Sequence, residues 1–439
     1  MKRGHITATL TLIAVVVALV LHAACGRGER AATLGHDAYI WQRQWTSSLD
    51  RAVIASASRV RAWRVLATEV EVDGRIVESS PHLDVLARAA KPVIPVIRIS
   101  GRRSDWNENE RTDLIRRSQT LVHRWRDAGV DVAGVEIDYD CPTSSLRRYA
   151  SFLSTLRQAH PRDVTVSITA LPAWLDSAYL RDLLQQVDEA VLQVHAVEHP
   201  RAGLFDRDRA LAWARAWAEV SRISGVNRGN GGNGGNGVPF RIALPTYGSR
   251  VTWARDDRIT AIESESRTFA DPASGREIFA TPLDVTSFIN TLRDEPPAHL
   301  AGLVWFRVPT AEDERAWSLE TWHAVMDGRA LSSGGEIDAT VEPSAEIPGL
   351  SDVYLHNRGA VDVMIPERVT ITSPGMCEAA DAVAPYAMEK RATEKRAMGK
   401  QAMAIEFRRV SPRLLARDRR TLIGWVRCPT GEIQIHAGS

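Results

Sequence analysis

Residues 132–171, with the sequence VAGVEIDYDCPTSSLRRYASFLSTLRQAHPRDVTVSITAL, decide the fold of this chain. The first part (132–139) and the last part (164–171) are rich in apolar and β-branched residues that favour strands. Between them, residues 144–160 have apolar side chains at helical spacing. A strand, a helix and a second strand in this order are typical of one parallel βα unit.

The same alternation continues on both sides of this unit. Runs typical of strands occur at residues 38–45, 63–70, 93–99, 132–139, 164–171, 190–195, 240–247 and 300–308. Helical patterns separate them at residues 108–128, 144–160, 178–187, 207–223, 282–293 and 311–326. Eight strands over about 290 residues predict an α/β fold, a (β/α)8 TIM barrel. A doubly wound open sheet is the competing fold, but no GxGxxG sequence follows the first strand.

The N-terminus has the pattern of an export signal. Lys2 and Arg3 precede an apolar run at 12–21, and small residues lie directly before Cys25. The run is shorter than the roughly 20 residues that a membrane span needs. We predict a signal peptide at 1–24 and a tether at 25–36, with Cys25 resembling the lipidated cysteine of bacterial lipoproteins. The expected location is the bacterial envelope, periplasmic or on the outer surface.

The rest of the chain divides into a barrel and a smaller domain. We expect the barrel at 37–330, with two insertions: a Gly- and Asn-rich surface loop at 227–237, and residues 248–281 near the barrel mouth. Residues 331–349 are rich in Ser, Gly, Pro and Glu, which predicts a linker. Apolar and polar residues alternate over 350–439, which predicts a small antiparallel β domain, with a helix or mobile loop at 384–401.

The cysteines and the overall composition limit the compartments and binding partners that are compatible with this protein. In an oxidising compartment Cys377 and Cys428 can pair, which leaves Cys141 unpaired. With 55 Lys and Arg against 54 Asp and Glu the net charge is +1, which disfavours nucleic acid as a partner. The 13 Trp exceed both the 8 Phe and the 7 Tyr, which suggests that indole faces are used for binding.

Three acids are concentrated on the strand at 132–139 and directly after it. Because side chains two apart share a face of a strand, Glu136, Asp138 and Asp140 are expected to point into the barrel. Crowding like charges is costly unless one carboxyl is protonated or each has partners. A raised pKa on one acid beside an ionised neighbour is the arrangement of a general acid.

These residues resemble the DGxDxDxE signature of glycoside hydrolase family eighteen, the chitinase-type barrels. Ala133 stands at the first acid of the signature, and Asp140 stands at its final glutamate, the family's catalytic acid. The resemblance implies that Asp140 is the proton donor. It also implies that Asp138 orients an acetamido group or stabilises positive charge, while Glu136 tunes Asp138 by sharing a proton.

A second resemblance covers most of the barrel. The strand acids, followed by SLRRYASFL at 145–153 and SITALPAWL at 167–175, are similar to the exported bacterial family of unknown function numbered 3142. That family has no assigned activity, so this resemblance identifies the domain and leaves its chemistry open.

Other strand ends supply candidate substrate-binding residues: Trp41, Glu69, Arg98, Trp174, Gln193, His195, Tyr247, Trp305 and Arg307. In chitinase-type barrels an indole at the end of the eighth strand forms the floor of a sugar subsite, and Trp305 matches that place. Aromatic planes beside acids suit carbohydrate, because the C–H face of a sugar ring packs on them.

Several alternatives compete with this site. Arg98 and Arg307 could neutralise Glu136 or Asp138 in a purely structural ion network. A metal at His195, Glu198 and His199 is disfavoured against a hydrogen-bonded histidine, since a loop does not provide helical spacing. A serine hydrolase is disfavoured because no GxSxG motif is present. We therefore predict no metal and no cofactor.

Three functions follow from these patterns. The leading hypothesis is an exported glycosidase-like barrel that acts on an envelope or environmental polysaccharide, anchored to the membrane by an N-terminal lipid. The second is a non-catalytic carbohydrate-binding lipoprotein, and the third is a structural envelope protein. At this level both an enzyme and a binding protein stay open.

Overall fold

The computed structural model describes residues 34–101, 107–224, 237–264, 275–328, 337–347, 349–395, 401–428 and 433–438. The predicted signal peptide, Cys25 and most of the tether at 25–36 lie outside these ranges, as does the tract 227–236. In the described ranges, no helix is both long enough and apolar enough to cross a membrane.

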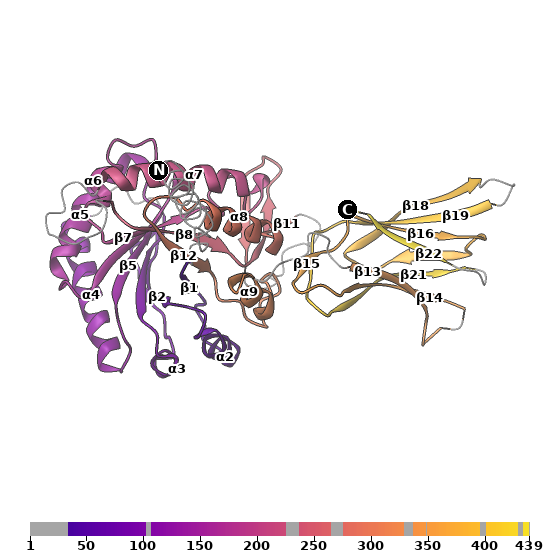
Figure 1. Cartoon of the computed structure of the whole chain (residues 1–439), viewed down its shortest axis with the longest axis horizontal. Coiled ribbons are helices and arrows are strands. Elements are labelled where there is room, and N and C mark those ends of the chain that lie inside the picture. The colour runs from indigo at the N-terminus through magenta and orange to yellow at the C-terminus, as the bar shows by residue number, and fades with distance from the viewer. Residues whose placement is uncertain are drawn as a thin grey trace, which may run out of the picture.

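Parallel strands close into a barrel in the N-terminal part of the chain, to the left in Figure 1. Strand β1 pairs with β2 on one side and with β12 on the other, which closes the sheet. Among the described residues the barrel has eight strands: β1 (His36–Ile40), β2 (Ala62–Val70), β4 (Val93–Ile99), β5 (Gly134–Tyr139), β6 (Thr165–Ala170), β7 (Glu189–Gln193), β8 (Phe240–Pro245) and β12 (Leu300–Phe306). The predicted α/β barrel is confirmed.

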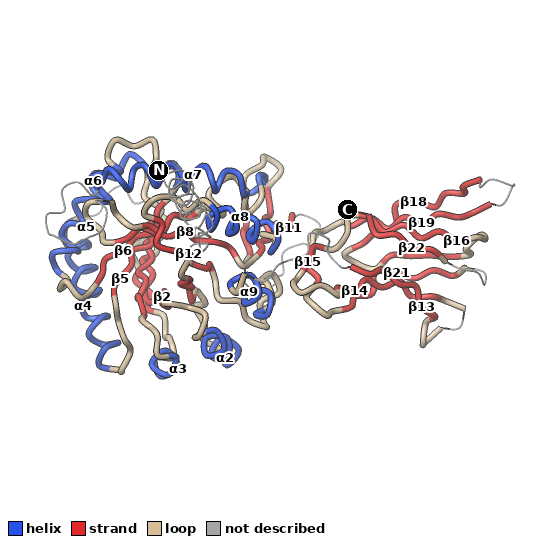
Figure 2. The backbone as a smooth tube through the Cα atoms, viewed as in Figure 1, coloured by secondary structure: helices blue, strands red, loops and turns tan. Residues whose placement is uncertain are grey.

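Helices surround the barrel, as Figure 2 shows. They are α2 (Ser47–Ser56), α3 (Leu83–Ala89), α4 (Glu108–Asp127), α5 (Leu146–Ala159), α6 (Leu180–Leu184), α7 (Arg207–Ser224), α8 (Pro282–Asp294) and α9 (Leu319–Met326), with short 3-10 helices η1 (Thr143–Ser145), η2 (Pro172–Trp174) and η3 (Pro200–Ala202). Local sequence sets several helix starts. Helix α4 begins with a capping box between Asn107 and Glu110, which satisfies backbone N–H groups that the helix leaves unpaired.

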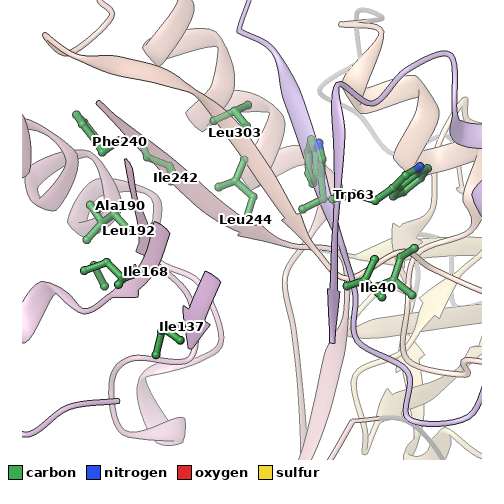
Figure 3. Packing of buried hydrophobic residues seen from close by; sticks show 14 of the residues in the cluster. Ile40, Trp63, Ile137, Ile168, Ala190, Leu192, Phe240, Ile242, Leu244 and Leu303 are labelled. Carbon is green, nitrogen blue, oxygen red and sulfur yellow. The ribbon is translucent and has the colours of Figure 1, made fainter. Parts of the chain in front are cut away.

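The main core lies between the strands and these helices. On β5 the outward residues Val135, Ile137 and Tyr139 join this core, together with Ile168 of β6 and Leu192 of β7. Figure 3 shows part of the packing. Fully burying one such side chain stabilises the fold by about 1.5–3 kcal/mol. The alternation along β5 therefore places Glu136 and Asp138 on the opposite, inward face.

Two small antiparallel additions flank the barrel. Strand β3 (Ile76–Glu78) pairs with the end of β2. The predicted insertion at 248–281 contains a three-stranded sheet directly after β8, made of β9 (Gly248–Trp253), β10 (Ile259–Glu263) and β11 (Gly275–Phe279), with β9 in the centre.

The C-terminal part forms a β domain, to the right in Figure 1. One sheet contains β13 (Ile337–Pro343), β14 (Ser351–Asn357), β21 (Arg420–Arg427) and β17 (Ala379–Ala382). The other contains β18 (Tyr386–Lys395), β19 (Gln401–Arg409), β16 (Arg368–Ser373) and β22 (Gln434–Gly438), and a short pair joins β15 (Val363–Met364) to β20 (Leu414–Leu415). Both sheets contribute to one core that includes Val353, Ile371, Phe407 and Ile423. The predicted antiparallel β domain is confirmed.

Two segments of this region differ from the sequence-based expectation. The expected helix or mobile loop at 384–401 is wrong where the chain is described, because β18 and β19 form a long antiparallel pair there. Pairing of β19 with β16 on its other side outweighs the helical propensity of Ala, Glu and Lys. Strand β13 also lies inside the segment 331–349 that was expected to be a linker.

An aspartate of the C-terminal domain holds the start of the last barrel helix. Ser318, the N-cap of α9, donates a backbone hydrogen bond of 2.6 Å and a hydroxyl hydrogen bond of 2.8 Å to the Asp362 carboxylate. The backbone N–H of Asp362 donates in turn to the Thr321 hydroxyl at 2.8 Å. The two domains therefore share a hydrogen-bonded contact at this helix terminus.

Cys377 and Cys428 form a disulfide within the C-terminal domain, while Cys141 is a free, buried thiol, as predicted. The two half-cystines are 51 residues apart in sequence. Closing a loop of that length restricts the unfolded chain and stabilises the folded domain by about 4 kcal/mol in the chain-entropy treatment.

We expect the double variant Cys377→Ala, Cys428→Ala to lose about 4 kcal/mol of stability in the C-terminal domain. Scanning calorimetry should show one transition moving to lower temperature while the transition of the barrel stays in place. Cys141→Ala serves as the control, because Cys141 forms no cross-link and lies in the barrel core. A thermogram of the double variant that matched the wild type would refute the prediction.

Candidate active site

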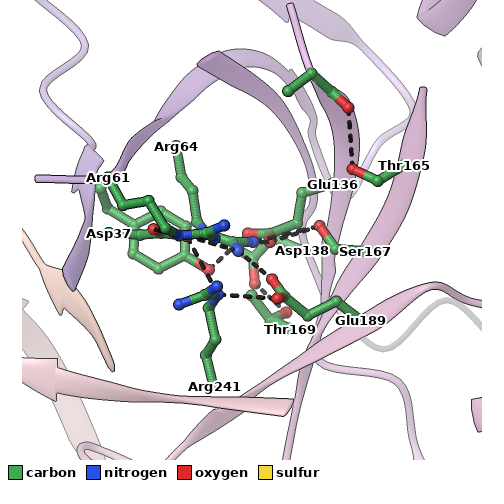
Figure 4. Close-up of polar contacts among 12 residues, drawn as sticks. Asp37, Arg61, Arg64, Glu136, Asp138, Thr165, Ser167, Thr169, Glu189 and Arg241 are labelled. Carbon is green, nitrogen blue, oxygen red and sulfur yellow. Dashed lines mark hydrogen bonds and ion pairs between the residues drawn. The ribbon is translucent and has the colours of Figure 1, made fainter. Parts of the chain in front are cut away.

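The lowest inward layer of the barrel is a buried ion cluster, formed by Asp37, Arg64, Glu136, Glu189 and Arg241. The Arg64 guanidinium is fully buried and pairs with Asp37 at 3.0 Å and with both Glu136 and Glu189. Arg241 pairs with Glu189 at 2.9 Å from the other side. Figure 4 shows Arg64 in the middle of these carboxylates. Each buried charge therefore has an opposite partner, which offsets the cost of removing it from water.

Glu136 belongs to this layer and is sealed from solvent. It pairs with Arg64 and accepts hydrogen bonds from the Ser167 hydroxyl at 2.9 Å and the Tyr39 hydroxyl at 2.5 Å. Glu136 is not among the residues that line the pocket above. The expectation that Arg98 or Arg307 neutralises Glu136 is therefore corrected, since Arg64 does so. An arginine inside the apolar strand sequence AWRVLATEV was the available signal for this role.

An apolar layer separates the ion cluster from the barrel mouth. It consists of inward side chains one step further along the strands: Tyr39, Leu66, Val96, Val191, Ala243 and Val304. Above it, at the carboxyl ends of the strands, lies a pocket of about 120 Å³. Its lining comes from seven strands or the loops that follow them: Tyr39, Trp41, Arg98, Asp138, Asp140, Thr169, Val191, Gln193, His195, Ala243, Tyr247 and Phe306.

Asp138 and Asp140 are the two acids of this pocket. Asp138 accepts a hydrogen bond of 2.6 Å from the Thr169 hydroxyl, whereas the side chain of Asp140 is exposed. Burial, followed by the negative charge of Asp140, raises the pKa of Asp138 from its ordinary value to about 6. The charge of Arg98 and the Thr169 hydrogen bond act in the opposite direction. Asp138 therefore exchanges its proton close to neutral pH.

The contribution of Glu136 to Asp138 is electrostatic. Its charge also raises the pKa of Asp138, but less than burial and Asp140 do. The structure shows no hydrogen bond between the described side chains of Glu136 and Asp138, so the expected sharing of a proton is replaced by the Arg64 ion pair.

Aromatic rings form the wall opposite the acids. Phe306 is at the centre of this group, with ring centroids 5.1 Å from Trp41, 5.5 Å from His195 and 5.6 Å from Tyr247. His195 is almost fully buried, and burial lowers its pKa to about 3, so the imidazole stays neutral. Its Nδ1 atom lies 3.5 Å from the Tyr247 hydroxyl. The pocket thus combines two carboxyls with a largely aromatic surface.

Trp305 does not form the floor of this pocket, contrary to the expectation from the sequence. Its side chain is fully buried among Trp317 and Trp322 on the outer side of β12, and its Nε1–H donates to His36 at 3.1 Å. Val304 and Phe306 point inward, so Trp305 between them must point outward. Counting this alternation from Val304 would have identified Phe306.

The other predicted residues are distributed as follows. Trp41, Arg98, Gln193, His195 and Tyr247 line the pocket. Glu69 lies beside it, where it pairs with Arg43 at 2.9 Å.

Trp174 and Arg307 are not among the residues that line the pocket. Trp174 is in the outer core and donates its Nε1–H to the Cys141 carbonyl at 2.9 Å. Arg307 is buried and pairs with Asp313. Both were predicted to bind substrate, and the structure instead gives them packing and ion-pair contacts.

The three side chains considered as metal ligands do not lie together. His195 is buried in the pocket wall, Glu198 pairs with Arg209, and His199 accepts a backbone hydrogen bond from Arg201 at 3.3 Å. Across the described residues, no group of three or more His, Cys, Asp or Glu side chains is placed to hold a metal ion.

The fold and the pocket together define a barrel protein with paired carboxyls and aromatic walls at the carboxyl ends of its strands. The chain belongs to the family described as "Domain of unknown function (DUF3142)", whose model matches residues 89–311. The predicted membership in family 3142 is confirmed. The model of a second family, "Domain of unknown function (DUF8456)", matches residues 340–429, within the C-terminal part of the chain.

Several solved structures are similar to the chain at low sequence identity. The spore cortex-lytic enzyme SleL of Bacillus cereus is 12% identical, with a TM-score of 0.46 over 67% of this chain and 74% of that one. SleL of Bacillus megaterium is 10% identical, with a TM-score of 0.49 over 69% and 75%. A chitinase of Chromobacterium violaceum is 12% identical, with a TM-score of 0.44 over 68% and 99%. No curated protein matches the chain.

Proposed function

We propose that this protein is an exported glycosidase-type barrel that hydrolyses a polysaccharide by acid catalysis from Asp138 and Asp140. The observation that carries the proposal is the pair itself. Two carboxyls lie at the end of one strand in a pocket, and the pKa of Asp138 is raised to about 6. A pair with one proton between them can supply both an acid and a charge near neutral pH.

The roles of the two acids follow from their positions. Asp140, exposed at the mouth, takes over the one proton of the pair and donates it to the glycosidic oxygen as the bond to the anomeric carbon breaks, which leaves Asp138 ionised. Asp138, held by Thr169, orients an N-acetyl group of the substrate or stabilises the positive charge that develops at the anomeric carbon. Water then supplies the hydroxyl of the new reducing end, and its remaining proton returns to the pair of acids. Trp41 and Phe306 offer aromatic faces for the sugar ring.

Export rests on the N-terminal pattern and is supported by the disulfide. The Cys377–Cys428 bond is of the kind that persists in oxidising compartments outside the cytosol. Lipidation at Cys25 anchors the mature chain to a membrane of the envelope in this proposal.

The function is tested by incubating the purified protein with chitin, peptidoglycan and exopolysaccharide preparations and measuring new reducing ends. We expect hydrolysis of at least one of them, and we expect Asp140→Asn to lower the rate by about 10²–10⁴-fold, because the proton donor is lost. Asp140→Glu should retain activity, since it restores a carboxylic acid one methylene longer.

Asp182→Asn is the matched control, because this exposed aspartate lies on α6, outside the pocket lining. Its rate should equal that of the wild type. If no preparation is hydrolysed, or if Asp140→Asn is as active as the wild type, the proposal is wrong.

The second candidate is a carbohydrate-binding protein without turnover. The exposed position of Asp140, at the place of a longer glutamate in the chitinase-type signature, favours it. Binding of a glycan that persists in Asp140→Asn, is lost in Trp41→Ala and is accompanied by no hydrolysis in the wild type would select this candidate.

A further inference from the structure

Arg98 is a cation in the wall of the pocket that the proposed hydrolysis does not use. It lies on β4, in register with Asp138 of β5 on one side and Glu69 of β2 on the other. Its guanidinium carbon is 5.7 Å from the centre of the Trp41 ring, and its side chain is 35% exposed. The guanidinium is therefore fixed at the pocket wall while part of it faces solvent.

The contacts of Arg98 leave its hydrogen-bond donors available. In the described part of the chain it has one ion pair, to Glu69 Oε1 at 3.8 Å, and no hydrogen bond. Glu69 itself is already held by Arg43, at 2.9 and 3.1 Å to its Oε2 atom, and by the Ser100 hydroxyl at 3.0 Å. Arg43 thus neutralises Glu69, and no described residue accepts a hydrogen bond from the Arg98 guanidinium.

A guanidinium in the pocket wall suits an anionic ligand better than a neutral sugar. A guanidinium presents parallel N–H donors whose spacing matches the two oxygens of a carboxylate, and hydrogen bonds between two charged groups are about twice as strong as neutral ones. The acids that face Arg98 are Glu69, Asp138 and Asp140. Glu69 is neutralised by Arg43, and Asp138 loses its charge below pH 6 or so, which leaves Asp140 as the one of these three acids that repels an added anion.

We propose that Arg98 binds a carboxylate of the glycan, so that the substrate is an acidic polysaccharide in which a charged sugar occupies the pocket beside Asp138 and Asp140. The inference rests on the proposed function and names its substrate class. The carboxylate belongs either to a uronic acid or to an acidic ether substituent such as a lactyl group, and both present the same planar pair of oxygens.

Bound carboxylate and ionised Asp138 repel each other, which couples binding to protonation. The ligand raises the pKa of Asp138 further, so the complex takes up a proton when the free protein has Asp138 ionised. Affinity for the acidic ligand should therefore fall as pH rises through 6, whereas affinity for a neutral ligand should change less.

The test compares matched oligosaccharides by titration calorimetry on the full chain, in an Asp140→Asn background that prevents turnover. The acidic probes are a hyaluronan tetrasaccharide, which carries glucuronate, and the disaccharide of N-acetylglucosamine and N-acetylmuramic acid, which carries a lactyl ether. Chitotetraose is the neutral probe. We expect one acidic probe to bind at least tenfold more tightly than chitotetraose at pH 5.5, and the probe that does so identifies the source of the carboxylate.

Arg98→Met should lower the affinity for that acidic probe by about 10- to 100-fold and the affinity for chitotetraose by less than threefold. Arg88→Met is the matched control, since it removes an exposed cation of α3 outside the pocket lining and should leave both affinities unchanged. Melting curves confirm that the variants are folded.

Chitotetraose binding as tightly as both acidic probes would overturn the inference and leave the proposed function standing. An equal loss of affinity for acidic and neutral probes in Arg98→Met would also overturn it. If none of the three probes binds, the inference and the proposed function fail together.

Discussion

Arg64→Met should lower the free energy of unfolding of the barrel by about 3–5 kcal/mol. The variant removes the only described guanidinium that contacts Asp37, Glu136 and Glu189 together, and leaves the fully buried Glu136 without an ion pair in the described structure. Breaking a buried pair from one side is costly, because the remaining charge stays away from water without compensation. Urea denaturation followed by tryptophan fluorescence measures the change.

Arg88→Met is the control for this substitution. Arg88 lies on α3 with a 67% exposed side chain, and its ion pair to Asp84 is on the surface. We expect it to change stability by no more than about 0.5 kcal/mol. A soluble Arg64→Met protein within 1 kcal/mol of the control would show that the ion layer does not support the barrel.

Asp138→Asn should lower the rate of hydrolysis by at least about 10²-fold and at the same time stabilise the protein at pH 7 and above. The folded chain holds the Asp138 carboxyl with a pKa of about 6, whereas the ordinary value is 3.8. The difference corresponds to roughly 3 kcal/mol at most, reduced by the partial exposure of the side chain. Asparagine has no charge to desolvate, and its oxygen can still accept the hydrogen bond from Thr169.

The sign of the pH effect follows from proton binding. Between pH 4 and 6 or so the folded protein binds more protons at Asp138 than the unfolded chain does, so stability falls as pH rises. Above this window both states are ionised and the cost is constant. The stability of Asp138→Asn relative to the wild type should therefore increase from pH 4 to pH 7 and then level off.

Urea unfolding of both proteins at pH 4, 5.5, 7 and 8 measures this difference, with Asp182→Asn as the control for the substitution itself. The difference should reach about 1–3 kcal/mol at pH 7. A difference that stayed the same across all four pH values would contradict the raised pKa of Asp138. Hydrolysis by the variant should fall by at least about 10²-fold, because the pair of acids is broken.

The acids of β5 show how much of the site the local sequence pattern predicts. Alternation along β5 correctly predicted that Glu136 and Asp138 share the inward face, since a strand has only two faces. Depth along the barrel axis was not predictable in this way. Glu136 lies in a layer with Arg64 of β2 and Glu189 of β7, and those strands meet it only through the closed sheet.

The indole at the end of the last barrel strand shows the same limit. The residue type suggested a sugar-binding platform at Trp305, but the inward positions Val304 and Phe306 determine that Trp305 packs against Trp317 and Trp322. Tertiary context also overrides local propensity at 384–401, where β18 pairs with β19, itself paired with β16, so that an Ala-, Glu- and Lys-rich segment becomes a strand.

The amino-acid sequence alone determined the order of strands and helices, the closed barrel, the β character of the C-terminal domain and its disulfide. These depend on short-range periodicity, on chain length and on cysteine count, all of which are local or additive properties. Tertiary structure alone decided which charges pair in the barrel interior, which aromatic ring faces the pocket, and that the Arg98 guanidinium donates no hydrogen bond to a described residue. These depend on contacts between strands far apart in the chain, whose geometry exists only once the barrel has closed.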